Sequence, residues 1–96
     1  VELVVHGHRH FYERFAPMTP DLVRDDARGI RQFIIGTGGE DVWPPPTQTA
    51  ANSEVLSPSG AIGVLKLTLR SGSYDWQFVP VAGQSFTDSG TTSCHD

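Results

Sequence analysis

Cysteine, lysine and long apolar runs are scarce in this chain of 96 residues. A single cysteine, Cys94, cannot form a disulfide within the chain, so it is either free or paired with a cysteine elsewhere. Lys66 is the one lysine, and the net charge is −4, which argues against a basic surface for nucleic acid or anionic membranes. No apolar run approaches the roughly 18 residues of a transmembrane helix. We therefore expect no nucleic-acid partner and no membrane partner.

Glycine and proline, in contrast, are common, and they predict many loops. Ten glycines and seven prolines beside an apolar fraction of 38% argue against a compact all-helical domain. A chain of this length makes one small domain at most. The apolar run Leu3-Val4-Val5 begins almost at the first residue, and a natural N-terminus rarely precedes a buried strand so closely. We expect the chain to be a segment of a longer polypeptide.

Two short strands are predicted in the first half of the chain. Residues 2–6 form a continuous apolar run, which is typical of a strand that is covered on both faces. Residues 31–35 form a second candidate, which ends at the glycine-rich residues 36–39, where the backbone must turn sharply or approach another group closely. Residues 11–29 show no clean period. Residues 40–59, with their proline run, predict an extended surface excursion.

The clearest local pattern predicts a β-hairpin near the C-terminus. Apolar and polar residues alternate in residues 61–69 and again in 73–80, and a Ser-Gly turn joins the two segments. The alternation places three leucines opposite three aromatic residues on one apolar face: Leu65, Leu67 and Leu69, with Tyr74, Trp76 and Phe78. A two-stranded hairpin is marginal alone, so this face needs a second layer.

Three of the four histidines lie in the sequence His6-Gly7-His8-Arg9-His10, directly after the first predicted strand. Neutral imidazole is a good ligand for zinc, iron and manganese. If the strand geometry continued, His6, His8 and His10 would lie on one face. Spacing alone does not decide between a metal site and a set of hydrogen-bonded surface histidines.

The flanking residues give this cluster a context. Gly7-His8-x-His10, preceded by Leu3-Val4-Val5 and followed by Tyr12-Glu13-Arg14, resembles the last metal-binding motif of the calcineurin-like metallophosphoesterases. The resemblance is greatest to the purple acid phosphatase branch and its bacterial relatives. The segment from Phe33 to Gly39 is similar to the family's next strand and glycine turn, and Tyr74 to Phe78 is similar to its closing strands.

The resemblance implies an α/β fold, the four-layer αββα sandwich, in the full-length protein. Residues 1–82 would then be the C-terminal portion of that domain, mainly strands and loops with a closing hairpin, and residues 83–96 a polar tail or linker. His8 would bind one metal and His10 the other, in a pair of iron, zinc or manganese ions. Such a pair activates a hydroxide that attacks a phosphate ester.

The other family ligands, an Asp-x-His, a Gly-Asp, a Gly-Asn-His and a lone histidine, would precede residue 1, because none of these motifs is present in the sequence. The partners implied are therefore a phosphate-ester substrate and the upstream remainder of the domain. We expect the isolated chain to be inactive, because two histidines leave the metal ions largely uncoordinated.

Several neighbouring residues have two open roles. His6 stands where the family often has a small polar residue, so it is a candidate catalytic donor to the phosphate or a group that hydrogen-bonds a metal ligand. Arg9 either faces solvent or contacts the substrate phosphate. Phe11 replaces a more usual polar residue, which leaves specificity at the mouth of the site open. We expect Glu13 and Arg14 to be structural, pairing with the backbone or with each other.

Two further features favour simple surface roles. Glu40-Asp41 is expected to be a solvated loop tip and His95 a surface residue of the tail.

Cys94 in a polar tail, together with the habit of the family, suggests a secreted or periplasmic protein.

Two other interpretations stay open. The aromatic row Tyr74, Trp76 and Phe78 also suits a non-catalytic, β-rich extracellular binding module, if the row forms an exposed platform. A truncated and inactive product is the third interpretation. It predicts that residues 2–6 lack neighbouring strands and that the leucine and aromatic faces of the hairpin lack a cover.

Overall fold

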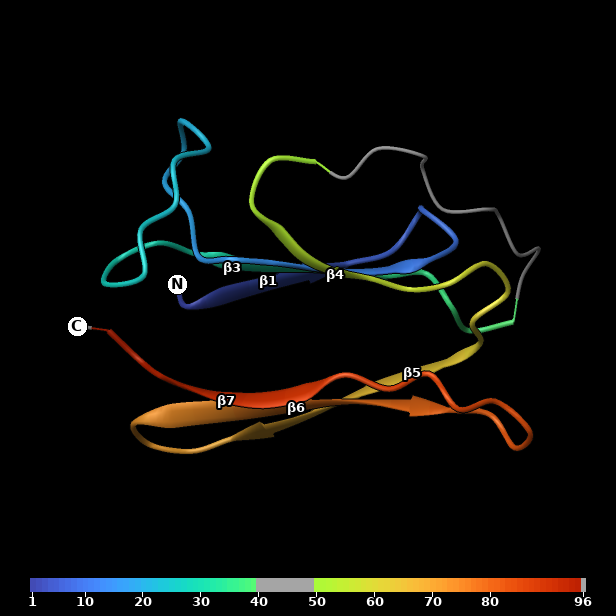
Figure 1. Cartoon of the computed structure of the whole chain (residues 1–96). Coiled ribbons are helices and arrows are strands. Elements are labelled where there is room, and N and C mark those ends of the chain that lie inside the picture. Colours follow the sequence, from blue (N-terminus) through green and yellow to red (C-terminus); the bar gives the residue numbers. More distant parts are fainter. Residues whose placement is uncertain (40–49, 96) are drawn as a thin grey trace.

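The structure, a computed structural model, describes residues 1–39 and 50–95 of the chain. These residues form an all-β arrangement of two sheets that lie one over the other, with no helix in either described segment (Figure 1). The strands, in chain order, are β1 (Leu3–His6), β2 (Tyr12–Phe15), β3 (Arg31–Ile35), β4 (Ser53–Leu56), β5 (Gly63–Leu69), β6 (Ser73–Pro80) and β7 (Ser89–Ser93).

The first sheet contains four strands in the order β1-β3-β2-β4. β1 and β3 run parallel, with Leu3 opposite Arg31 and His6 opposite Ile34. β2 is antiparallel to both β3 and β4. The strand predicted at residues 31–35 is confirmed with those bounds. The strand at residues 2–6 is confirmed as Leu3–His6, but it lies at the edge of the sheet, and Val4 and Val5 are 43% and 41% exposed rather than covered.

The second sheet contains β5, β6 and β7 in that order, all antiparallel. The predicted hairpin is confirmed, and each leucine stands opposite the expected aromatic residue: Leu65 opposite Phe78, Leu67 opposite Trp76, and Leu69 opposite Tyr74. Residues 83–96 were expected to be a polar tail, but Ser89–Ser93 pairs with β6 as β7. The small polar side chains of β7 form a strand because the backbone, which every residue shares, makes the ladder.

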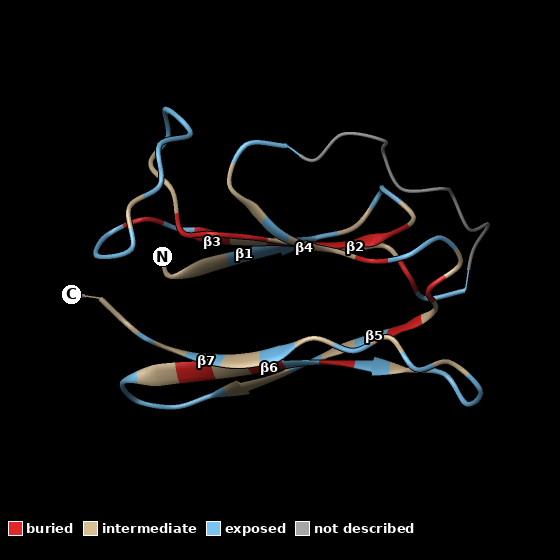
Figure 2. Cartoon of the chain, viewed as in Figure 1, coloured by how far each residue is buried: buried red, intermediate tan, exposed pale blue. Residues whose placement is uncertain are grey.

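An aromatic core joins the two sheets. Figure 2 shows the buried residues along the strands of both sheets. The ring centroids of Phe33 and Trp76, one from each sheet, lie 5.7 Å apart in an edge-to-face arrangement, and those of Tyr12 and Phe78 lie 5.0 Å apart. The buried members of this cluster are Tyr12, Phe33, Tyr74, Trp76 and Phe78. The expectation that the aromatic face of the hairpin lacks a cover is therefore wrong, because the first sheet covers it.

Two strands of the first sheet fall where no strand was predicted. β2 lies in residues 11–29 and β4 in the proline-rich segment 40–59, of which residues 40–49 lie outside the described part of the chain. β2 carries buried residues on both faces, so its sequence does not alternate: Tyr12 joins the aromatic core, whereas Phe15 joins a smaller cluster with Phe11 and Ile34. β2 thus connects the core to the loop that carries the histidines.

Candidate metal-ligand loop

The histidine loop begins where β1 ends. The strand ends at His6, and a series of bends follows before β2 begins at Tyr12. Side chains alternate between two faces only within a strand, and this alternation does not continue through bends. Only His6 lies in the strand, so strand geometry does not place His6, His8 and His10 on one face. The loop is tight: the Arg9 N–H donates a 2.9 Å hydrogen bond to the Gly7 carbonyl.

The glycine turn after β3 packs directly against this loop. Because β1 and β3 are parallel, their last residues, His6 and Ile35, lie at the same end of the two strands. A Cβ atom placed on Gly36 would lie only 1.9 Å from the Arg9 carbonyl oxygen, so no side chain fits there. The Gly36 N–H donates to the Phe11 carbonyl at 3.2 Å and so holds the far end of the loop. The close approach predicted at this glycine is confirmed, and the backbone it meets belongs to the histidine loop.

His8 has an unusual backbone conformation. Its φ angle is +73°, in the left-handed region that residues with a Cβ atom rarely adopt. Such a conformation costs on the order of 1–3 kcal/mol, and strained residues of this kind cluster at functional sites. Among the residues of the loop, the strain thus falls on one of the two predicted metal ligands.

The other predicted site residues lie at the surface. His6 and Gln32, on the neighbouring strand β3, are joined by a 2.7 Å hydrogen bond between Nε2 of the imidazole and the side-chain amide nitrogen. The bond between His6 and Gln32 keeps the His6 ring beside that amide. His8 and Arg9 are exposed, and His10 is half-buried. The roles of His6 as a donor to phosphate and of Arg9 as a substrate contact stay predictions.

Few possible metal ligands lie close together in the part of the chain that the structure describes. In residues 1–39 and 50–95, the structure places no three histidine, cysteine, aspartate or glutamate side chains close enough together to hold a metal ion. A catalytic ion needs about three protein ligands, and a pair of ions needs more. His8 and His10 therefore do not fit a complete dinuclear centre within the described residues, and Glu40-Asp41 lies outside them.

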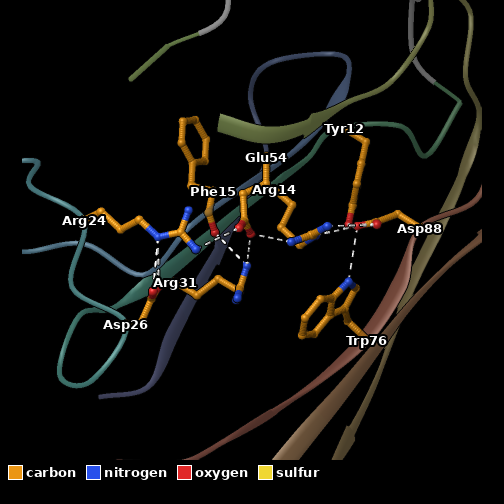
Figure 3. A network of polar contacts seen from close by, with 9 residues as sticks. All are labelled: Tyr12, Arg14, Phe15, Arg24, Asp26, Arg31, Glu54, Trp76 and Asp88. Atoms are coloured by element: carbon orange, nitrogen blue, oxygen red, sulfur yellow. Dashed lines mark hydrogen bonds and ion pairs between the residues drawn. The ribbon is translucent and has the colours of Figure 1, made fainter. Parts of the chain in front are cut away.

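Directly after the loop, Tyr12 and Arg14 enter a polar network between the sheets (Figure 3). Asp88, which precedes β7, accepts hydrogen bonds from the Tyr12 hydroxyl at 2.5 Å and from Arg14 Nε at 2.8 Å. Arg14 also pairs with Glu54 on β4, and its guanidinium lies 5.0 Å from the centroid of the Trp76 ring. Arg14 is structural, as expected, but its partners are Asp88 and Glu54 rather than Glu13.

The ionisation of this network follows from its burial and its contacts. Burial raises the pKa of the Asp88 carboxyl, but hydrogen bonds from Arg14, Tyr12 and Trp76 outweigh it and hold the pKa below its usual value. Burial also raises the pKa of the Tyr12 phenol, and the bond to Asp88 raises it further. Tyr12 therefore stays protonated near neutral pH and donates its proton to Asp88.

Glu13, which was expected to be structural, is buried, and His95 is less exposed than the surface role expected for it. Glu13 is only 3% exposed, and its Oε2 atom is buried without a hydrogen-bond partner. His95 was expected to be a surface residue of the tail, but it is half-buried: its backbone N–H donates to Glu2 Oε2 at 3.1 Å. Glu2 precedes β1, so this bond joins the two ends of the described chain.

Surface features elsewhere bear on the binding-module interpretation. Tyr74, Trp76 and Phe78 are 3%, 6% and 0% exposed, so the aromatic row forms no exposed platform. An open polar groove crosses the outer face of the second sheet; its lining residues include Lys66, Asp75 and Gln77. A second groove beside His6 is mainly apolar and includes Val4, Leu22 and Ile30.

No helix in the described residues is long and apolar enough to cross a membrane. Comparison of the chain with protein-family models, with curated proteins and with solved structures finds no match.

Proposed function

We propose that this chain is the part of a calcineurin-like metallophosphoesterase that carries the last two histidine ligands, His8 and His10. The position of the loop is the observation that supports this proposal best. The loop follows a strand of a parallel pair, and the carboxyl ends of parallel strands are a common place for active sites in sheets with parallel strands. The tight packing of Gly36 against Arg9 and the strained backbone of His8 define the shape of the loop.

In this proposal the remaining metal ligands come from outside the 96 residues. Two histidines cannot saturate even one catalytic ion, so the isolated chain is inactive toward phosphate esters. The helical layers of an αββα sandwich would also lie outside the described residues, which supply two β layers. The ions would be iron, zinc or manganese, and a secreted or periplasmic location belongs to the same proposal.

A zinc titration of the chain, followed by NMR of the histidine ring signals, tests the assignment of the ligands. We expect the signals of His8 and His10 to respond together, with an affinity below that of a four-ligand zinc site. The response should be lost in the His8→Ala/His10→Ala variant and kept in His95→Ala, the matched control for a histidine outside the loop. Hydrolysis of p-nitrophenyl phosphate should not rise above the rate of zinc alone.

Two outcomes would contradict the proposal. If zinc perturbs His95 or His6 and leaves His8 and His10 unchanged, the loop does not bind metal. If two ions bind tightly and the chain hydrolyses the ester, the site is complete within the chain, and the missing ligands have been misjudged.

A further inference from the structure

The end of the histidine loop is fixed by backbone hydrogen bonds on two sides. Only Phe11 stands between His10 and Tyr12, the first residue of β2. The Phe11 carbonyl accepts from the Gly36 N–H at 3.2 Å. The Ser57 N–H donates to the Tyr12 carbonyl at 2.9 Å, and the Tyr12 N–H donates to Ser57 Oγ at 3.1 Å. A displacement of Tyr12 is therefore passed to His10 through a single residue.

The side chain of Tyr12 connects this residue to the second sheet. Its ring is fully buried, and the ring centroid lies 5.0 Å from that of Phe78 and 5.9 Å from that of Phe86. The hydroxyl donates a 2.5 Å hydrogen bond to Asp88 Oδ2. A buried hydroxyl needs a hydrogen-bond partner, and ring packing alone does not specify where the hydroxyl points. Asp88 thus determines the direction of the Tyr12 side chain.

Asp88 is held through both its backbone and its side chain. The Phe78 N–H on β6 donates to the Asp88 carbonyl at 2.7 Å, and the neighbouring Thr87 hydroxyl donates to the Phe78 carbonyl at 2.6 Å. The carboxylate also accepts from Trp76 Nε1 at 3.2 Å and from Arg14 Nε at 2.8 Å (Figure 3). The Asp88 side chain is only 9% exposed. The acceptor that Tyr12 meets is therefore fixed in place by β6 and its neighbours.

A polar network between two sheets contributes position more than it contributes stability. Replacing a whole buried ionic network by apolar residues of similar volume is often neutral or stabilising. Hydrogen bonds are directional, however, so a network whose members are all paired specifies where each side chain lies. At the Tyr12–Asp88 contact, the group whose position is specified is the one that follows the histidine loop.

We propose that Asp88 is a positioning residue of the histidine loop, which acts through the Tyr12 hydroxyl to fix the place of His10. The inference extends the proposed function, and its metal-binding part rests on that function. Metal–ligand distances tolerate deviations of only about 0.2 Å, so a small displacement of Tyr12 is enough to weaken metal binding. Residues 83–96, expected from the sequence to be a tail, then supply a support of the site.

NMR of the histidine ring signals in the absence of zinc tests the positioning itself. Asp88→Asn should shift the signals of His10 and of His8, although residue 88 is remote from both in the sequence. Asp75→Asn is the matched control, because the Asp75 carboxylate also accepts hydrogen bonds but lies on the outer face of the same sheet. It should leave the signals in place. Near-ultraviolet circular dichroism checks that both variants are folded, so that a shift reports the loop and not unfolding.

Tyr12→Phe tests the route of this effect. The substitution removes the hydroxyl and keeps the ring, and it should shift the same histidine signals. Tyr74→Phe is its control, because it removes the hydroxyl of another core tyrosine that is only 3% exposed. In the Tyr12→Phe background, Asp88→Asn should add little further shift, since the connection is already broken.

A zinc titration of the same variants measures the consequence for binding. Asp88→Asn and Tyr12→Phe should each weaken the zinc affinity of the loop several-fold, and the two control variants should keep the affinity of the parent. If the parent chain binds no zinc through the loop, the proposed function fails, and the zinc-free signals still decide the positioning.

Four results would overturn the positioning role. The first is a folded Asp88→Asn variant whose zinc-free loop signals match those of the parent, and the second is an equal shift in the control variants. The third is an Asp88→Asn effect of the same size with and without the Tyr12 hydroxyl, because Asp88 would then act by another route. The fourth is a parent chain that binds zinc through the loop while Asp88→Asn and Tyr12→Phe bind it equally well.

Discussion

The Tyr12 hydroxyl donates a 2.5 Å hydrogen bond to Asp88 Oδ2, and this bond connects two segments that are 76 residues apart in the sequence. Tyr12 begins β2 in the first sheet, and Asp88 precedes β7 in the second. Asp88 also accepts from Trp76 Nε1 at 3.2 Å and from Arg14 Nε at 2.8 Å. One carboxylate thus satisfies donors from both sheets, next to the end of the histidine loop.

Removing this carboxylate should destabilise the fold. Asp88→Asn keeps the size of the side chain but loses the charge, so Arg14 loses one of its two carboxylate partners and keeps only Glu54. We expect the free energy of unfolding to fall by about 1–3 kcal/mol, the cost of weakening charge-assisted hydrogen bonds in a largely buried position while Glu54 still compensates the charge of Arg14. Urea unfolding followed by tryptophan fluorescence measures this change. The control is Asp75→Asn, whose exposed pair with Arg70 should leave the urea midpoint unchanged.

The same carboxylate predicts acid sensitivity. The pKa of Asp88 is lower in the folded chain than its ordinary value of 3.8. A group with a lowered pKa stabilises the folded state fully above its unfolded pKa, and loses that contribution as the pH falls through the folded pKa. Urea midpoints measured from neutral pH downward should therefore decrease most steeply below about pH 4. In Asp88→Asn this decrease should be smaller; a variant with the same acid profile as the parent would refute the assignment.

The sequence predicted those strands whose signal is local. β3 and the β5–β6 hairpin alternate or form compact apolar runs bounded by turn residues, and their register follows from the turn. β7 has no such signal, because Ser89–Ser93 is small and polar and becomes a strand only by pairing with β6. β2 and β4 were missed because polar residues such as Glu13 and Glu54 interrupt their apolar pattern. Tertiary contacts decide these three strands.

The site was predicted to a similar extent. The position of the histidine loop after β1, and the need for glycine at residue 36, follow from short motifs. Asp88 was missed, because it lies in a polar segment with no period and meets Tyr12 only once both sheets have formed. The left-handed backbone of His8 was not predicted either, because histidine, although enriched among non-glycine residues in that region, adopts it only in a small fraction of its occurrences.

The left-handed backbone of His8 predicts that substitution by glycine changes the free energy of unfolding in opposite directions at His8 and at His10. His8→Gly should relieve the strain at φ +73° and leave the free energy of unfolding unchanged or raise it by up to about 1 kcal/mol. His10→Gly, where no positive φ is present, should lower it by about 0.5–1 kcal/mol through chain entropy. Thermal or urea unfolding of both variants measures the difference. Equal destabilisation by the two substitutions would show that His8 is not strained in solution.

Gly36 offers the sharpest test of how the loop is held. An added Cβ would lie 1.9 Å from the Arg9 carbonyl oxygen and 2.8 Å from its carbon, and backbone atoms cannot move aside as a flexible side chain can. Gly36→Ala should therefore displace the loop and cost about 1–3 kcal/mol or more of stability. Gly38→Ala, two residues along the same turn, meets no atom within 4 Å and should cost little. The NMR ring signals of His8 and His10 should shift in Gly36→Ala and keep their positions in Gly38→Ala. If both alanine variants leave those signals in place, the contact between the glycine turn and the histidine loop does not determine the loop conformation.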